Sequence, residues 1–155
     1  MKRALGLRAE AQQIHWAVVE GTKFSPILVA HDKAAAPVTL TDGPALSWYR
    51  KRLQLVVQAH SPQAAAVRSA EQIARGGNRE GSRRRLRIEG VLLQTIDELG
   101  IPVGLGGLAA ISSRLGSHRA KRYIESGDFR GLDLTNLTSI AREAVLVAVA
   151  ALPGD

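Results

Sequence analysis

The chain has 155 residues, enough for a hydrophobic core, and we expect residues 1–155 to form a single domain. It has no cysteine, which excludes disulfides and cysteine-ligated zinc, and it has no apolar run near the roughly 18–20 residues of a membrane span. The net charge is +7, which favours polyanionic partners, and the N-terminus lacks the apolar segment of a signal peptide, so we expect a cytoplasmic protein.

The first half of the chain begins with strand patterns. Three strands rich in valine, isoleucine or leucine are predicted at residues 3–8, 14–20 and 26–31. Asp42 and Pro44 suit the start of a short helix at 42–52. The compact apolar run at 53–58 predicts a buried strand. A helix is then predicted from Ser61-Pro62 to about Arg75, ended by Gly76-Gly77.

The second half is mainly helical. Residues 83–99 predict a long helix, with Ile88, Leu92 and Ile96 on one apolar stripe. A short strand is predicted at 101–103, and further helices are predicted at 109–115, 119–126 and 138–152. The whole order predicts an α/β fold, in which three antiparallel strands are followed by parallel α-β units and the mixed sheet is flanked by helices.

The opening hairpin carries a family resemblance. The apolar strand with Gly6 ends in Arg8, and after a polar turn the chain returns through Trp16 and Val18-Val19. This hairpin resembles that of the RuvC-like (Holliday junction resolvase-like) proteins of the RNase H-like superfamily, in which the first strand ends in aspartate. The resemblance implies an RNase H-like sheet.

Further segments extend the resemblance along nearly the whole chain. They are residues 55–58 with the following Arg68-Ser69-Ala70, residues 86–103, residues 115–122 and residues 140–148. In the family, the segment corresponding to residues 55–58 is a strand that ends in a metal-binding glutamate. The segment corresponding to 115–122 contacts DNA, and the last helix carries two aspartates. What the resemblance implies about the reaction depends on these acidic positions.

The four positions that correspond to catalytic acids are Arg8, Gln58, Ile140 and Glu143. Magnesium needs oxygen ligands and negative charge, and a two-metal site needs shared carboxylates. One glutamate beside an arginine cannot supply them, so we expect no catalytic residue and no metal site here. We expect Arg8 and Glu143 to form a salt bridge instead. None of the other acidic residues matches a family motif position.

Basic residues gather in two clusters. The predicted nucleic-acid-binding residues are Arg83, Arg84, Arg85 and Arg87 in the first, and Arg114, Arg119, Lys121 and Arg122 in the second. Cations in a first helical turn oppose the macrodipole at roughly 0.3–1 kcal/mol each, which indicates that the first cluster has a use. Phosphate and acidic protein surfaces both fit arginine, and Tyr123 is a candidate stacking partner for the second cluster.

Our leading hypothesis is a catalytically silent RuvC-like module that binds nucleic acid, DNA in particular, or a protein partner within a larger assembly. The first alternative is a divergent metal-dependent endonuclease with relocated ligands. The second is a pure protein-interaction scaffold. We expect no cofactor, and magnesium only under the enzyme alternative. A homodimer is compatible with the resemblance, and no membrane partner is expected.

Overall fold

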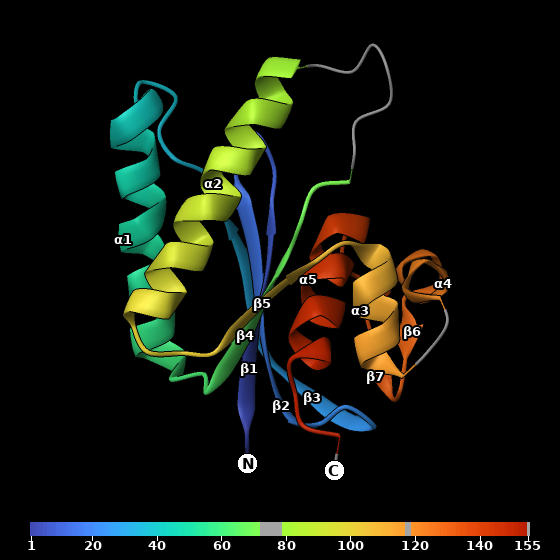
Figure 1. Cartoon of the computed structure of the whole chain (residues 1–155). Coiled ribbons are helices and arrows are strands. Elements are labelled where there is room, and N and C mark those ends of the chain that lie inside the picture. The colour runs from blue at the N-terminus through green and yellow to red at the C-terminus, as the bar shows by residue number, and fades with distance from the viewer. Residues whose placement is uncertain (72–78, 117–118, 155) are drawn as a thin grey trace.

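The computed structural model describes residues 1–71, 79–116 and 119–154, and it shows an α/β fold with helices on both faces of a central sheet (Figure 1). Within these residues, five strands pair in the order β3-β2-β1-β4-β5. Their bounds are β1 (Arg3–Ala9), β2 (Ile14–Thr22), β3 (Ser25–Ala34), β4 (Ala64–Arg68) and β5 (Val103–Gly106). The first three are antiparallel, whereas β4 and β5 run parallel to β1, so the predicted mixed sheet is confirmed.

Helices cover the two faces separately. On one face lie α1 (Asp42–His60) and α2 (Arg79–Glu98), and on the other lie α3 (Leu108–Leu115), α4 (Ala120–Ser126) and α5 (Ser139–Ala150) (Figure 1). A small hairpin, β6 (Asp128–Phe129) with β7 (Leu132–Asp133), follows α4. None of the described helices is long and apolar enough to cross a membrane.

Strand alternation divides the core into two halves. Leu5 and Leu7 of β1 pack toward α1 and α2, while Ala4 packs toward α5. The central strands present small residues on the α5 side, because this helix lies very close to the sheet. A Cβ added at Gly6 would lie 2.1 Å from the main-chain oxygen of Ala144. Glycine at this position therefore sets the height of α5 above β1.

The predicted strand at 53–58 is wrong, because these residues continue α1. Tyr49, Leu53 and Val56 are buried at helical spacing, and the helix ends only at Ser61, whose φ is +50°. A short apolar run fits a buried strand and a buried helix segment equally well, so its length alone did not decide between them.

The predicted helix from Ser61 to Arg75 is also wrong. Residues 64–68, Ala-Ala-Ala-Val-Arg, form strand β4, which pairs with β1 on one side and β5 on the other. Alanine has a high helix propensity, but pairing on both sides and burial between two helix layers override it. The expected end at Gly76-Gly77 lies outside the described residues. The helix predicted at 42–52 begins where expected but runs to His60, and the strand predicted at 101–103 lies at Val103–Gly106. The remaining predicted helices and the first three strands are confirmed within a few residues.

Candidate functional site

Two arginines meet at the carboxyl ends of the central parallel strands. Arg8 near the end of β1 and Arg68 at the end of β4 are register partners. Because successive side chains of a strand point to opposite faces of the sheet, both arginines lie on the α5 face, together with Gly6 and Ala66. Their side chains are only 13% and 6% exposed. Two cations in so little water require a compensating anion.

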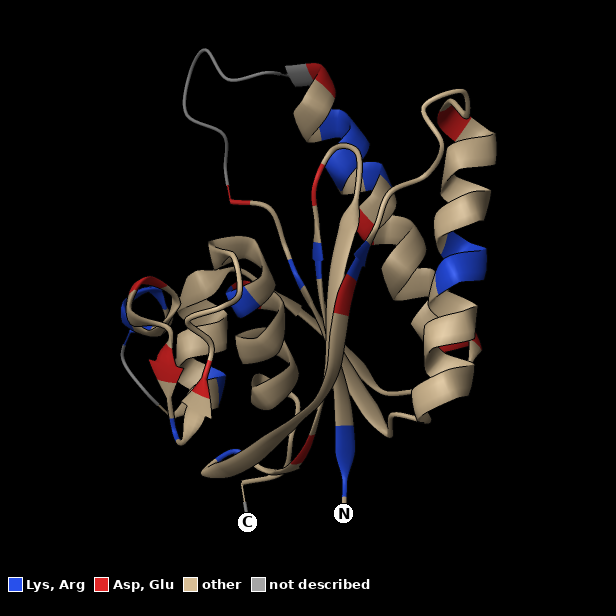
Figure 2. Cartoon of the chain, turned by 180° about the vertical axis from the view of Figure 1, so that it is seen from behind, with Lys and Arg blue, Asp and Glu red and all other residues tan. Residues whose placement is uncertain are grey.

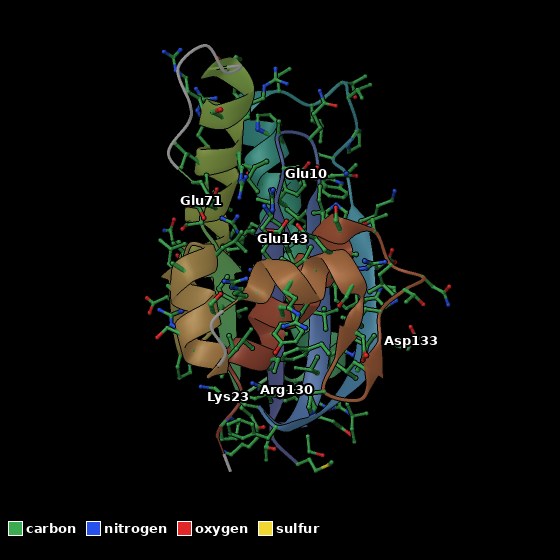
Figure 3. All side chains as sticks on the ribbon, turned by 90° about the vertical axis from the view of Figure 1, so that its right-hand side faces the viewer. Glu10, Lys23, Glu71, Arg130, Asp133 and Glu143 are labelled. Atoms are coloured by element: carbon green, nitrogen blue, oxygen red, sulfur yellow. The ribbon has the colours of Figure 1, made fainter. Side chains whose placement is uncertain are left out.

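Glu143 of α5 supplies that anion. Its Oε1 accepts a hydrogen bond from Arg68 Nε at 2.9 Å, and its Oε2 accepts one from Arg8 Nε at 3.4 Å. Each arginine also donates through Nη1 to a main-chain carbonyl, that of Ala9 or Ser69. Figure 3 shows Glu143 at this end of the structure. The expected contact between Arg8 and Glu143 is present, and Arg68 was missed.

The other expected positions lie differently. Gln58 is exposed on α1 and has no part in the site, because the segment that carries it is helical. Arg68 holds the strand-end position that was expected for Gln58. Ile140 is half-buried in the first turn of α5, one turn before Glu143. Ile140 and Glu143 therefore lie one turn apart on α5, whereas the strand predicted at 53–58 was placed too early, because the strand is β4. The parallel pairing of β1 with β4, which places Arg68 opposite Arg8, would have identified Arg68 as a residue of the site.

A third arginine approaches from α2. The side chain of Arg85 is 18% exposed, and its Nε lies 3.2 Å from Glu89 Oε2. Glu89 is buried and also accepts the main-chain N–H of Ala70 at 2.9 Å. Burial lowers the pKa of Arg85, the positive charge of Arg8 lowers it further, and Glu89 partly offsets both effects. We call Arg8, Arg68 and Arg85 the arginine cluster.

One donor of this cluster has no partner. Arg85 Nη2 is buried and makes no hydrogen bond with any described residue. Buried polar groups in native proteins are nearly always hydrogen-bonded, directly or through water or a ligand. The arginine cluster therefore has an unused donor at a place that excludes most of the solvent.

Two more acidic residues lie at the rim. Glu71 is 60% exposed at its side chain, lies 3.3 Å from Arg68 Nη1, and accepts the N–H of Leu108 at 3.0 Å. Glu10 lies 3.0 Å from His15 Nε2. Burial raises the pKa of Glu10, but hydrogen bonds from Gln13 and His15 and the charges of His15 and Arg8 outweigh it, so the pKa is lowered. Figure 3 labels Glu10, Glu71 and Glu143 in the upper half of the view.

The first predicted basic cluster divides into two parts. Arg83, Arg84 and Arg87 are 65%, 49% and 45% exposed at their side chains and share a single carboxylate, that of Glu80, at 4.0, 3.7 and 3.6 Å. Arg85 instead turns inward, so the four arginines do not form a single surface cluster. Because α2 begins at Arg79, the arginines lie beyond its first residues, where the macrodipole opposes them less. We call the three exposed residues the α2 patch.

The second basic cluster lies on the other face of the sheet. Arg114, Arg119, Lys121 and Arg122 are exposed, and we call them the α4 patch. Tyr123 is half-buried and its ring packs edge-on against Phe129 at 4.7 Å between centroids, so it is a packing residue here. In Figure 2, Lys and Arg segments mark α2, the ends of the central strands and α4. The two patches therefore lie on opposite faces of the sheet, and Arg8 and Arg68 of the arginine cluster lie at the ends of β1 and β4.

The donor set does not fit a divalent metal ion. Both oxygens of Glu143 already accept hydrogen bonds from guanidinium groups, and two buried arginines lie beside it. Magnesium prefers oxygen ligands with a net negative charge. Among the described residues, no three His, Cys, Asp or Glu side chains form a group that could hold a metal. No step of metal-assisted hydrolysis can be derived from these residues.

Comparison with known proteins identifies the fold. No protein-family model and no curated protein sequence matches this chain. Among solved structures, Thermus thermophilus RuvC in complex with Holliday junction substrate matches with a TM-score of 0.75 and 16% identity, over 97% of this chain and 92% of that chain. Another structure of Thermus thermophilus RuvC gives 0.76 and 18%, over 96% and 92%. The yeast mitochondrial Holliday junction resolvase Ydc2 gives 0.57 and 10%, over 96% and 77%.

These matches identify the fold of the chain. The chain has a fold of the RNase H-like superfamily. Its architecture matches the fold of the RuvC-like Holliday junction resolvases, at low sequence identity. The predicted resemblance is confirmed at the level of fold.

Proposed function

We propose that this chain is a catalytically silent RuvC-like module that binds nucleic acid, with DNA favoured. One observation carries the proposal: arginines occupy the adjoining ends of β1 and β4 and hold both oxygens of Glu143. That arrangement is positively charged where metal-dependent hydrolysis needs negative charge. Positive charge at the same place is suited to contact with phosphate.

The surface charge supports a nucleic-acid partner. The net charge is +7, and the α2 patch has three arginines against one glutamate. The α4 patch adds four exposed cations. Contacts of lysine and arginine with phosphates release counterions and position a protein on the duplex without selecting sequence. A solved protein with this fold, Thermus thermophilus RuvC, is itself in complex with Holliday junction substrate.

The test is a binding titration with a product gel. Fluorescence anisotropy with a four-way junction, a duplex and a single strand, at two salt concentrations, measures affinity and salt dependence. We expect binding to all three that weakens with salt, with a slope near −0.9 per phosphate contact on duplex DNA. We expect no cleavage in the presence of Mg²⁺ or Mn²⁺. Metal-dependent cleavage by the wild-type chain would support the divergent-endonuclease alternative and contradict ours.

A matched pair of variants locates the contacts. The triple variant Arg83→Gln, Arg84→Gln, Arg87→Gln should bind every sequence more weakly and show a flatter salt dependence. The control Arg50→Gln, Lys51→Gln, Arg52→Gln removes the same number of charges from α1 and should lose less affinity. Equal losses would show that only net charge matters. If the wild-type chain binds no nucleic acid at low salt, a protein-interaction scaffold becomes the better hypothesis.

A further inference from the structure

We infer that the arginine cluster is a binding site for one phosphate group, at the end of β1 and β4 beside α5. The inference rests on the proposed function and deepens it, since the natural ligand would be a backbone phosphodiester of the bound nucleic acid. Arg8, Arg68 and Arg85 would contact the phosphate oxygens. The α2 and α4 patches would hold the neighbouring phosphates.

The charge balance of the buried groups favours an anion. Three guanidinium groups face two buried carboxylates, those of Glu143 and Glu89, so the buried groups carry one positive charge, and the remaining negative charge comes from the more exposed rim carboxylates, Glu71 and Glu10. The three arginine side chains are at most 18% exposed, so water screens this excess weakly. Arginine presents several donors in a planar fork, which matches the geometry of phosphate oxygens.

The unused donor gives an independent reason. Arg85 Nη2 is buried and lacks a partner among the described residues, although its Nε is held by Glu89. A buried donor of a cationic group is costly when it stays unpaired. Burial of Arg85 and repulsion from Arg8 also lower the pKa of Arg85, and a bound anion would offset this lowering by stabilising the charged guanidinium. The site is therefore prepared for a negatively charged acceptor.

Glu71 shows how an anion can reach the cluster. Its exposed carboxylate contacts Arg68 Nη1 at 3.3 Å and the N–H of Leu108, the first residue of α3. In the absence of ligand it supplies negative charge at the rim. Because its side chain is 60% exposed, it can turn into solvent when a phosphate enters. Glu71 thus competes with phosphate, and its neutralisation should strengthen binding.

The experiment uses the full chain and three probes: inorganic phosphate, a 5′-mononucleotide and a single-stranded oligodeoxynucleotide. The ¹H–¹⁵N spectrum of the arginine Nε–H groups reports contact directly, with potassium chloride of equal ionic strength as the reference. We expect saturable shifts of the Arg68 and Arg85 resonances with phosphate and with the oligonucleotide. Comparison of the probes distinguishes a free phosphate compound from a nucleic-acid backbone.

Three variants carry the test. Arg85→Met keeps the aliphatic stem and should weaken phosphate binding about tenfold or more, since a charge-assisted hydrogen bond is lost. Arg50→Met removes an equal charge from α1 and should leave phosphate binding unchanged. Glu71→Gln should tighten it severalfold. If Arg85→Met does not fold cooperatively, Arg85→Met with Glu89→Gln removes the buried charge along with its partner.

The outcomes separate this inference from the proposed function. Absence of saturable phosphate shifts in the wild-type chain, or equal affinity in wild type, Arg85→Met and Glu71→Gln, would overturn the phosphate site. DNA binding that survives such a result would leave the proposed function standing on the two patches. Saturable binding of inorganic phosphate without affinity for any DNA would keep the site and contradict the proposed function.

Discussion

Replacement of Glu143 by glutamine is the most direct test of the site. Glutamine has nearly the same shape but no charge, so Arg8 and Arg68 would lose their shared anion while both guanidinium groups stayed buried. Exposed fractions of 11% for Glu143, 6% for Arg68 and 13% for Arg8 mean that water cannot replace the lost interaction. We expect a large loss of stability.

The magnitude follows from this burial. Removal of one partner from a buried ion pair costs about 3–5 kcal/mol. Glutamine Oε1 can still accept one hydrogen bond, which favours the lower end of that range. For a chain of this size about 3 kcal/mol lowers Tm by roughly 6–12 °C. Arg68 lies 2.9 Å from Glu143, whereas Arg8 lies 3.4 Å from Glu143. Arg68→Met should therefore cost more stability than Arg8→Met.

The assay is urea unfolding monitored by circular dichroism. The wild type, Glu143→Gln, Arg68→Met and Arg8→Met are measured side by side. The control is a triple variant, Arg8→Met, Arg68→Met and Glu143→Met, which removes all three charges together. Buried ion clusters replaced by apolar residues of similar volume are often neutral in stability or stabilising. The triple variant should therefore be more stable than Glu143→Gln alone.

Two results would refute this reasoning. If Glu143→Gln costs less than about 1 kcal/mol, its charge is not required by the two arginines in the folded chain. If the triple variant is less stable than every single variant, the side chains contribute through packing and not through charge compensation.

Two further predictions concern the elements beside the site. Gly6→Ala should destabilise the chain by about 3 kcal/mol in the same urea assay, because the new Cβ would lie 2.1 Å from Ala144 O and would push α5 from the sheet; an unchanged midpoint would contradict this close approach. The pKa of Glu10 is lowered in the folded chain, so its stabilisation is present above about pH 4.5 and is lost as the pH falls through the folded pKa. Between about pH 6 and pH 3, Glu10→Gln should lose less stability than wild type, and equal losses would show that Glu10 does not contribute.

Sequence patterns determined the elements whose signal is local. The first three strands show runs of β-branched and large aliphatic residues, and helix 83–99 shows a clear apolar stripe, so both were predictable without any partner. Local patterns also placed Arg8 near the end of the first strand and Glu143 in the last helix. The contact between these two residues was predicted from the resemblance to the RuvC-like proteins, so half of the site was predictable from the sequence.

Only the tertiary structure decided the rest. Residues 53–58 are apolar in a way that fits a helix or a strand, and residues 64–68 are alanine-rich, so local preference assigned each segment to the wrong element. Pairing with β1 and β5 makes 64–68 a strand, and this pairing brings Arg68 beside Arg8. The inward turn of Arg85 likewise depends on the position of Glu89 and on neighbours distant in sequence. Propensity acts over a few neighbouring residues, whereas strand pairing and charge compensation join segments from opposite ends of the chain, which is why the charge of this site became visible only in three dimensions.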